Sequence, residues 1–527
     1  MIKLENVSKS YGNREIIKID KLEIYDGDKI GIVGKNGAGK STLFDIITKD
    51  CIADTGKIDV KGKIGYIKQF NYTLEPNLSG GEIEKAEINK VLKENPDIIL
   101  ADEPSSNLDI ASIQYLIKRF KEFIGTILLI SHDRRLLDEV CSKIIEIDNS
   151  KINIYLGNYT DYKNQKEMEI KTKEDNYIKY IKEKEKLEKA INISKNTAKS
   201  MKKTPSRMGN SEARLHKREV ENKREKIEGH TKALQSRLEK LQVAERNIKE
   251  LPVYMKVPDT NIIKAKFAIT GESINIKYNK NIILDDINFN LPSNKITGLI
   301  GKNGAGKTSL VKRILSNDEN IYINERVNIG YFSQNLDVLD NNKTVLENVL
   351  KDSIQDEVTV RNILANLYIK GNDVFKNISN LSGGERVKVA ITKLLVGDYN
   401  LLILDEPTNF LDIYSIEAME KLIKLYKGTI LLISHDINLI DNVCNYLFII
   451  DNKKLIEFNG NYTEYKEFKD SQMERKAKLA FDNDLLLDVK ISEIISKLSY
   501  TNDEVKRKEL EKEYQELIKI KRNIRGN

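Results

Sequence analysis

Two short segments combine glycines with a lysine and a hydroxyl residue, a pattern suited to holding phosphate groups. GKNGAGKST begins at position 34 and GKNGAGKTS begins at position 301. Glycines let backbone N–H groups approach phosphate oxygens, and the start of the following helix adds a favourable dipole. The lysine would reach the β- and γ-phosphates, and the next hydroxyl (Ser41 or Thr308) would hold Mg²⁺. The sequence therefore predicts two sites for ATP and Mg²⁺. The residues assigned to the nucleotide are Gly34, Asn36, Gly37, Gly39, Lys40, Ser41 and Thr42 in the first segment, and Gly301, Asn303, Gly304, Gly306, Lys307, Thr308 and Ser309 in the second.

Acidic residues follow two apolar segments, IILADE and LLILDE. Buried parallel strands that end at a phosphate site have this composition. We assign Asp102 and Asp405 to the metal ion through water, and we assign Glu103 and Glu406 to polarising the attacking water. Acidic residues at a strand end are common on their own, and the matched glycine-rich segments favour the catalytic interpretation.

Three further pairs of residues occupy matching positions in the two parts of the chain. Two histidines follow ILLIS-type segments and could contact the γ-phosphate, although a single histidine there would more often be structural. Two glutamines follow IGYIK and IGYFS and suit a metal or water contact rather than an ordinary loop role. Two tyrosines share the spacing of the glycine-rich segments and could stack on adenine, or else pack in the core. These pairs are His132 and His435, Gln69 and Gln334, and Tyr11 and Tyr278.

These pairs belong to an internal duplication. The glycine-rich segments are separated by 267 residues, whereas LSGGE, ISHD and GNYT each recur after 303 residues. The change in separation arises between the glutamine and LSGGE, which lie 9 residues apart in the first half and 47 apart in the second. The first half has therefore lost most of a subdomain that the second half keeps. Apolar spacing of three and four predicts helices within 345–369.

The composition limits the class of protein. A chain of 527 residues exceeds the size of one hydrophobic core, so we expect more than one domain. It has no apolar run of membrane-spanning length and no apolar signal core near its start, which argues for a cytoplasmic protein without membrane helices. Its three cysteines lack the spacing of a disulfide framework or a zinc site, and the matched Cys141 and Cys444 are expected in the core.

A charged segment, 163–251, separates the two halves. Its two parts contain few helix breakers, and Ile227, Leu234 and Leu241 recur every seven residues in the second part. With Pro205 near the middle, this pattern predicts a hairpin of two helices, each about 40 residues and about 60 Å long.

The tip of this hairpin is strongly basic. Residues 195–218 contain eight Lys or Arg and one acidic residue, within a chain whose net charge is +7. A spacer between two domains is the simplest alternative, but a spacer does not require like charges gathered at one end. Such clustering suits a phosphate-rich polymer, RNA in particular. The candidate RNA-binding residues are Lys202, Lys203, Arg207, Met208, Arg214, Lys217 and Arg218.

The motifs, in this order, resemble the ATP-binding cassette (ABC) superfamily, and LSGGE is its specific signature. The resemblance implies that the cassettes pair head to tail, with each ATP between the P-loop of one half and the signature of the other. The signature residues concerned are Ser79 and Gly81 in the first half, and Ser382 and Gly384 in the second. Arg386 follows the second signature where Ile83 follows the first, so we expect unequal rates of hydrolysis at the two sites.

Duplicated cassettes joined by a basic helical hairpin resemble the ABC-F family. The segment PSRMGNSEARLHK is similar to the linker of its antibiotic-resistance branch, the Vga/Lsa-like ribosomal protection proteins. That resemblance implies a monomer without a permease subunit, whose linker reaches 23S rRNA and peptidyl-tRNA from the exit site of the 70S ribosome. There it would displace lincosamides, pleuromutilins or streptogramin A compounds. A housekeeping ABC-F translation factor is the main alternative, followed by a fused importer ATPase and a chromosome or DNA-repair ATPase.

The predicted fold class is α/β, with two ABC-type P-loop ATPase domains, a long α-helical hairpin linker and a helical C-terminal extension. The expected boundaries are 1–162 for the first ATPase domain, 163–251 for the linker, 252–465 for the second ATPase domain and 466–527 for the extension.

Overall fold

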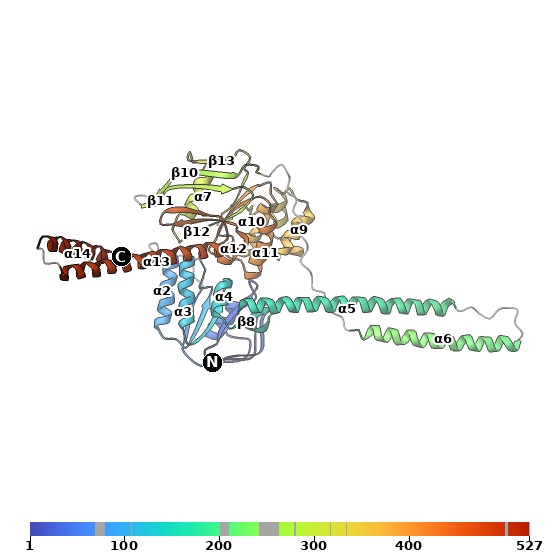
Figure 1. Cartoon of the computed structure of the whole chain (residues 1–527). Coiled ribbons are helices and arrows are strands. Elements are labelled where there is room, and N and C mark those ends of the chain that lie inside the picture. The colour runs from blue at the N-terminus through green and yellow to red at the C-terminus, as the bar shows by residue number, and fades with distance from the viewer. Residues whose placement is uncertain are drawn as a thin grey trace.

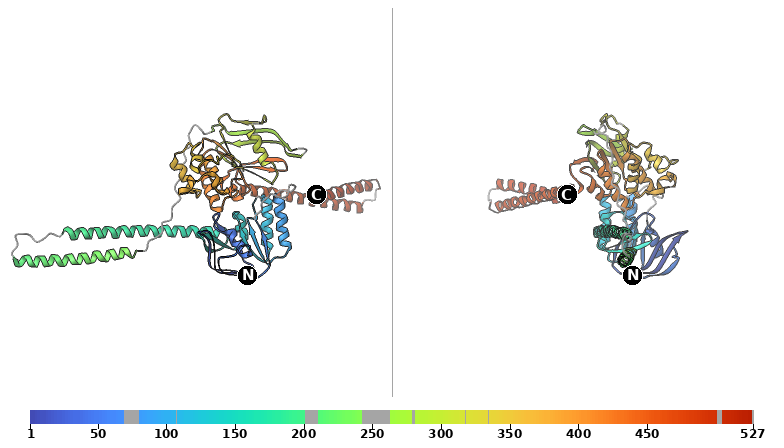
Figure 2. Two further views of the ribbon diagram at one scale, coloured as in Figure 1. Left: turned by 180° about the vertical axis from the view of Figure 1, so that it is seen from behind. Right: turned by 90° about the vertical axis from the view of Figure 1, so that its right-hand side faces the viewer.

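The computed structural model describes residues 1–68, 80–106, 108–200, 210–241, 263–278, 281–316, 318–333, 335–500 and 504–525. Two α/β domains pack together, and two pairs of long helices extend away from them in opposite directions (Figures 1 and 2). This arrangement confirms the predicted fold class. No helix within the described ranges is long and apolar enough to cross a lipid bilayer.

Each domain is built on a six-stranded sheet with a buried P-loop strand. In the first domain the strand order is β5-β6-β7-β3-β8-β9, and in the second it is β14-β15-β16-β12-β17-β18. All neighbours are parallel except the last pair in each sheet. Parallel strands covered on both faces are expected to be apolar throughout, as β6 and β15 are. The strands of the first sheet are β3 (Lys29–Gly34), β5 (Ile64–Ile67), β6 (Ile98–Asp102), β7 (Thr126–Ile130), β8 (Lys143–Asp148) and β9 (Lys151–Leu156). Those of the second are β12 (Ile296–Gly301), β14 (Ile329–Phe332), β15 (Leu401–Asp405), β16 (Thr429–Ile433), β17 (Tyr446–Asp451) and β18 (Lys454–Phe458).

A smaller antiparallel sheet lies beside each of these sheets. The helix that follows each P-loop, α1 (Lys40–Thr48) or α7 (Lys307–Leu315), shares a buried apolar core with both sheets of its domain. The loop before that helix is therefore held by the packing of all three elements. The antiparallel strands are β1 (Ile2–Tyr11), β2 (Arg14–Ile24) and β4 (Thr55–Val60) in the first domain, and β10 (Phe267–Tyr278), β11 (Asn281–Pro292) and β13 (Ile321–Ile323) in the second.

Further helices cover the face of each six-stranded sheet that lies opposite the P-loop helix, and these helices differ between the halves. The second half has an extra helical subdomain, whose residues form one apolar core with the rest of the domain. It confirms the helices predicted within 345–369. It consists of α8 (Val345–Leu350), α9 (Glu357–Asn366) and two short 3₁₀ helices, η2 (Gly371–Phe375) and η3 (Ile378–Asn380). The remaining helices are α2 (Gly80–Lys93), α3 (Ile110–Glu122) and α4 (Arg134–Val140) in the first half, and α10 (Gly383–Val396), α11 (Ile413–Leu425) and α12 (Ile437–Val443) in the second.

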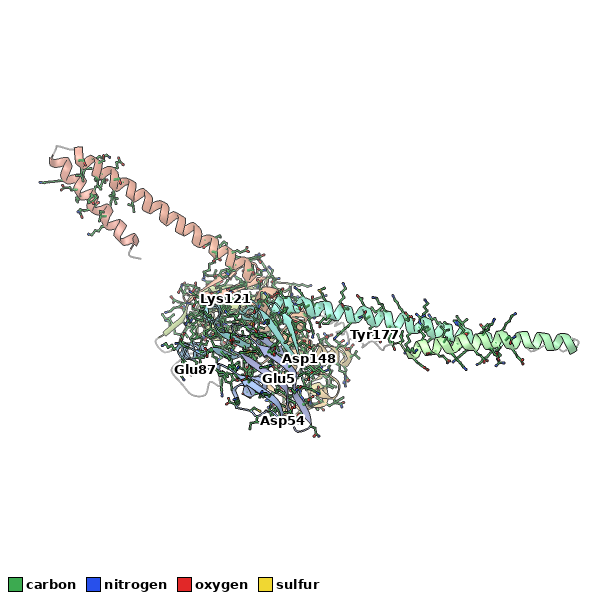
Figure 3. All side chains as sticks on the ribbon, turned by 90° about the horizontal axis from the view of Figure 1, so that it is seen from below. Glu5, Asp54, Glu87, Lys121, Asp148 and Tyr177 are labelled. Atoms are coloured by element: carbon green, nitrogen blue, oxygen red, sulfur yellow. The ribbon has the colours of Figure 1, made fainter. Side chains whose placement is uncertain are left out.

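The linker forms two antiparallel helices, α5 (Tyr159–Ser200) and α6 (Asn210–Glu239). Leu187 and Ile191 are buried between them, and the hydroxyls of Ser194 and Thr231 lie 2.7 Å apart. Most other described side chains of the two helices point into solvent (Figure 3). The hairpin prediction is therefore confirmed in its central part.

The first linker helix begins earlier than predicted. Helix α5 begins at Tyr159, four residues before the predicted boundary, because Tyr159 and Tyr162 pack in the core of the first domain. Helix α6 ends at Glu239, and residues 242–251 of the predicted second arm lie outside the described residues. The proposed domain boundaries remain predictions.

The C-terminal extension is also a helical pair, α13 (Tyr462–Tyr500) and α14 (Glu504–Arg525). Ile491 and Ile494 of α13 are buried. Cys141 and Cys444 are buried in the two domain cores, as predicted.

Candidate nucleotide-binding sites

The two P-loops depend on glycines in the left-handed backbone region. Gly39 and Gly306 both have φ of 101° and directly precede α1 and α7. A Cβ atom at Gly306 would lie 2.7 Å from Cγ2 of Ile283, and one at Gly39 would lie 2.7 Å from Cγ2 of Ile16. Only glycine satisfies both the backbone angle and the space, so the sequence requirement is local and steric.

The P-loop lysines lie inside their own loops. Nζ of Lys40 donates to the carbonyl of Gly34 at 2.8 Å, and Nζ of Lys307 donates to the carbonyl of Gly301 at 2.9 Å. Burial lowers the pKa of both ammonium groups, while nearby carboxylates, chiefly Glu103 and Glu406, partly offset this shift. Each ammonium group is thus held at the loop where phosphate would bind.

Hydroxyl and carboxylate groups meet beside the second P-loop. Oγ1 of Thr308 donates to Oδ2 of Asp405 at 3.1 Å. The other oxygen of Asp405, Oδ1, is buried and accepts no hydrogen bond from the described residues. Burial raises the pKa of Asp405 and of its counterpart Asp102. A hydroxyl with a carboxylate that has a spare oxygen is a donor set suited to Mg²⁺, so the residues fit the predicted metal ion.

The two glutamates at the ends of β6 and β15 adopt an unusual backbone conformation. Glu103 has φ of 51° and Glu406 has φ of 53°, a left-handed conformation that costs a non-glycine residue about 1 kcal/mol. Each carboxylate accepts the backbone N–H of the histidine that follows the neighbouring strand, at 3.2 Å for His132 and 3.3 Å for His435. This strained turn aims each glutamate at its histidine.

Burial dominates the protonation of these groups. It raises the pKa of Glu103 and of Glu406 to about 8, and it lowers the pKa of His132 to about 3 and that of His435 to about 4. Each imidazole Nε2 lies 3.4 Å from a glutamate oxygen. Because the histidines stay neutral at pH 7, each contact joins a glutamate side chain to an uncharged imidazole and is not an ion pair.

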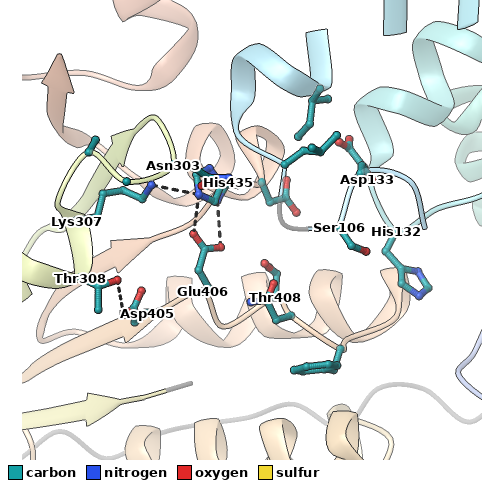
Figure 4. A pocket seen from close by; sticks show the side chains of 18 of the residues that line it. Ser106, His132, Asp133, Asn303, Lys307, Thr308, Asp405, Glu406, Thr408 and His435 are labelled. Carbon is teal, nitrogen blue, oxygen red and sulfur yellow. Dashed lines mark hydrogen bonds and ion pairs between the residues drawn. The ribbon is translucent and has the colours of Figure 1, made fainter. Parts of the chain in front are cut away.

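A cavity of about 610 Å³ lies beside the second P-loop and is lined by residues from both halves of the chain (Figure 4). It brings together most of the residues predicted around the second site, along with Glu103 and His132 of the first half. The predicted residues from the second half that line it are Asn303, Gly304, Gly306, Lys307, Thr308, Ser309, Asp405, Glu406 and His435.

The two halves contact each other through their P-loops. The backbone N–H of Asn36 donates to Oδ2 of Asp412 at 3.0 Å, and the backbone N–H of Asn303 donates to Oδ2 of Asp109 at 3.3 Å. Gly384 lies against the first P-loop, since a Cβ atom there would be 3.3 Å from Nδ2 of Asn36. The second signature therefore lies beside the first P-loop, a head-to-tail arrangement. The sequence analysis assigned no role to Asp109 and Asp412, which end the matching segments PSSNLD (104–109) and PTNFLD (407–412).

Comparison with known proteins agrees with this geometry. A family model described as ABC transporter matches residues 17–74 and 284–409, and a second model with that description matches 145–233. The ribosome protection protein VmlR of Bacillus subtilis is 29% identical, and the alignment covers 98% of this chain and 97% of VmlR. The energy-dependent translational throttle protein EttA of Escherichia coli is 28% identical over 86% of this chain and 93% of EttA. The chain is an ATP-binding protein of the ABC-F family. Its two ABC domains imply that it hydrolyses ATP.

Solved structures support the fold of this ABC-F protein. RNase-L Inhibitor superimposes with a TM-score of 0.58 at 20% identity, covering 89% of this chain and 93% of that one.

The remaining predicted residues of the ABC-F protein are placed as follows. Tyr11 is 56% exposed, its hydroxyl lies 3.7 Å from Sγ of Cys51, and Nζ of Lys9 lies 5.6 Å from the centre of its ring. Ser382 caps α10 through a reciprocal pair of hydrogen bonds with Glu385. Gly37 has a left-handed φ of 73° in the first P-loop, which Ser41 and Thr42 continue into α1.

Several predicted residues cannot be placed at a site. Tyr278 ends β10 and Gly81 belongs to α2, but nothing further of them is described. Arg214, Lys217 and Arg218 lie on α6, with their side chains outside the described part. The predictions that fall outside the described residues concern Gln69, Ser79, Lys202, Lys203, Arg207, Met208 and Gln334.

Proposed function

We propose that this ABC-F protein binds the ribosome in its ATP-bound form and protects it from antibiotics at the peptidyl-transferase centre. The observation that carries the proposal is the alignment with VmlR, which is named a ribosome protection protein and matches from end to end. The helical hairpin between the two ATPase domains supports it, because a long arm can reach a site that compact domains cannot enter.

ATP hydrolysis would proceed at each P-loop by attack of water on the γ-phosphate. In the second site, backbone N–H groups of the loop and Lys307 hold the phosphates, and Glu406 orients the water. Thr308 and Asp405 would hold Mg²⁺, which supplies neutralisation of the phosphate charge. His435 keeps the carboxylate of Glu406 in place through its backbone N–H. Lys40, Ser41, Asp102, Glu103 and His132 take the same roles in the first site.

ATP between the halves would hold them together, because each P-loop faces groups of the other half. Asp412 already reaches the first P-loop at Asn36, and Asp109 reaches the second at Asn303. Hydrolysis removes the γ-phosphate that both halves contact, which lets them separate. The hairpin would then be withdrawn from the ribosome.

The hairpin tip is the proposed contact with 23S rRNA and peptidyl-tRNA. Its lysines and arginines suit phosphate groups, and its length suits entry from the exit site. Lincosamides, pleuromutilins and streptogramin A compounds are the proposed drugs, on the family resemblance. A general translation factor is the alternative, which the similarity to EttA favours.

Ribosome binding can be tested by cosedimentation. A variant with Glu103→Gln and Glu406→Gln should accumulate on ribosomes with ATP, because it binds ATP without separating the halves. Lys40→Ala with Lys307→Ala is the matched control, which should not accumulate since neither P-loop holds phosphate. If the glutamine variant stays in the supernatant with ATP, the proposal that the closed, ATP-bound form binds the ribosome is wrong.

Protection can be tested by expression in a susceptible host with a panel of the three drug classes. Replacement of residues 203–212 by Gly and Ser should leave ATP binding intact and abolish protection. If the unaltered protein leaves the drug susceptibility of the host unchanged but improves its growth under translation stress, the result favours a general translation factor.

A further inference from the structure

Helix α11 of the second half is tied directly to the first P-loop. Its N-cap residue, Asp412, accepts the backbone N–H of Ser415 at Oδ1 (2.8 Å) and the backbone N–H of Asn36 at Oδ2 (3.0 Å). Nδ2 of Asn36 also donates to the carbonyl of Phe410 at 2.9 Å. Because one carboxylate bonds both the P-loop and the helix start, movement of the first P-loop must move the start of α11.

Two residues after Asp412, within its first turn, α11 contacts the first turn of the linker helix α5. The hydroxyls of Tyr414 on α11 and Tyr162 on α5 lie 2.9 Å apart. Both donate to Oε1 of Glu146 on β8, at 3.1 Å and 2.9 Å respectively. Glu146 is buried, and Nζ of Lys166 donates to its other oxygen at 2.6 Å. A buried network with its partners in place holds a single geometry, so α11 and α5 are joined rigidly here.

A second contact lies on the same side of α11. Oε1 of Glu417 accepts a hydrogen bond from Nζ of Lys163 at 2.9 Å and from the hydroxyl of Tyr159 at 3.3 Å. Both donors belong to the first two turns of α5. Ile413, at the start of α11, is fully buried in the core of the first domain. We call Asp412, Tyr414 and Glu417 the α11 contact.

The second P-loop has no equivalent of this connection among the described residues. Helix α3 reaches that loop through Asp109, just as α11 reaches the first loop through Asp412. The residues of α3 that match Tyr414 and Glu417 in the duplication are Ala111 and Gln114, and both are exposed. The two nucleotide sites are therefore connected unequally to the linker.

We propose that the first nucleotide site, made by the first P-loop and the second signature, sets the direction of the linker through the α11 contact. The second site holds the halves together without this influence. The inference rests on the proposed ATP-dependent closing of the halves, and it adds which site controls the arm. Tyr414 and Glu417 are positioning residues in this scheme, because they touch α5 and not the nucleotide.

The test uses the full chain with Glu103→Gln and Glu406→Gln, and with Cys51→Ala to remove the one cysteine that is not buried. Spin labels at Lys186→Cys on α5 and Lys424→Cys on α11 report the linker direction by pulsed electron resonance. Labels at Lys118→Cys on α3 and Lys424→Cys report closing of the halves. All three labelled positions are exposed. With ATP, both distances should become narrowly distributed in the parent protein.

Removal of the α11 contact should separate these two readouts. In the variant Tyr414→Phe with Glu417→Gln, the α3–α11 distance should still narrow with ATP, while the α5–α11 distance loses its narrow component. Both substitutions keep the shape of the side chain, so folding is preserved. The matched control is Gln114→Ala on α3, which should behave as the parent. A narrow α5–α11 distance in the Tyr414 and Glu417 variant overturns the inference.

Site specificity provides a second test. Lys40→Ala should abolish the narrow α5–α11 distance, whereas Lys307→Ala should retain it. The opposite pattern, or equal effects of the two lysine variants, overturns the inference and leaves the proposed function in place. A parent protein whose α3–α11 distance does not respond to ATP overturns the proposed function, and the inference with it.

Discussion

Arg134 of the first half and Glu420 of the second form a buried ion pair across the interface between the domains. Their side chains are 7% and 10% exposed, and Asp436 lies 3.8 Å from the same guanidinium nitrogen. Burial opposes the charge, but the bond to Glu420 and the charges of Asp436 and Glu417 hold the pKa of Arg134 above its ordinary value. The second half has Ile437 at the matching position, so this contact occurs on one side of the interface only.

Removal of one partner of this pair should destabilise the protein. Arg134→Met leaves Glu420 buried without its counterion, which costs about 3–5 kcal/mol when a buried pair is broken. We expect a lower apparent Tm by differential scanning calorimetry. The double variant Arg134→Met with Glu420→Met should recover much of the loss, because it removes the Glu420 charge that the single variant leaves without its counterion. If the double variant is as unstable as the single one, the pair is not the cause.

The glutamates should control hydrolysis but not ATP binding. Glu406→Gln removes the group proposed to orient the attacking water, and we expect steady-state ATP turnover at that site to fall about 10²–10⁴-fold. Binding of a fluorescent ATP analogue should stay the same, because Lys307 and the P-loop are untouched. Glu103→Gln measured in parallel shows how turnover is divided between the two sites. Weakened binding in either variant would contradict the assigned role.

The buried glutamates should also make stability depend on pH. Burial raises the pKa of Glu103 and Glu406 to about 8 in the folded protein, whereas unfolding returns it to about 4.5. The folded state therefore binds more protons in this range, and the free energy of unfolding should fall as pH rises from about 4.5 to about 8. The variant with Glu103→Gln and Glu406→Gln lacks these groups. As pH rises, its apparent Tm should therefore fall less than that of the unaltered protein. If the apparent Tm of both proteins depends on pH in the same way, the two glutamates do not contribute to this pH dependence.

The P-loop glycine Gly306 should not tolerate a side chain. Gly306→Ala places Cβ 2.7 Å from Ile283 at a φ of 101°, so both the loop and the start of α7 must shift. We expect loss of ATP binding at the second site, measured by isothermal titration calorimetry. Gly229→Ala is the matched control, because Gly229 lies within α6 with no atom near its Cβ position. That change should stabilise α6 by about 0.5–1 kcal/mol.

The linker hairpin should depend on a few buried residues at its centre. Ile191 is 6% exposed between α5 and α6, whereas Ile193 is 66% exposed on the same helix. Ile191→Ala should weaken the pairing of the two helices by about 2 kcal/mol, which hydrogen exchange of the α6 amides would detect. Ile193→Ala is the matched control and should leave exchange unchanged. Equal effects would show that the two helices do not depend on this packing.

Local features of the sequence were enough to predict the fold. The P-loop needs Gly39 and Gly306 for short-range steric reasons, and the apolar segments before Asp102 and Asp405 are typical of the buried parallel strands that they form. Repetition of these motifs then implied two similar domains. The prediction was less accurate at the start of the linker, because α5 begins at Tyr159, four residues before the predicted boundary, where Tyr159 and Tyr162 pack in the core of the first domain. Periodicity indicates which face of a helix is apolar, but tertiary packing decides where the helix starts.

The amino-acid sequence by itself determined which segments have the side chains and spacing suited to phosphate, which carboxyl groups follow a strand and which segments favour a helix, because these properties depend on near neighbours along the chain. Only the tertiary structure decided which distant residues meet. Asp412 bonds Asn36 from 376 residues away, and Tyr414 meets Tyr162 across the interface between the domains. The left-handed backbone of Glu406 is also a tertiary effect, because the surrounding sheet and the N–H of His435 hold a conformation that the residue alone would avoid.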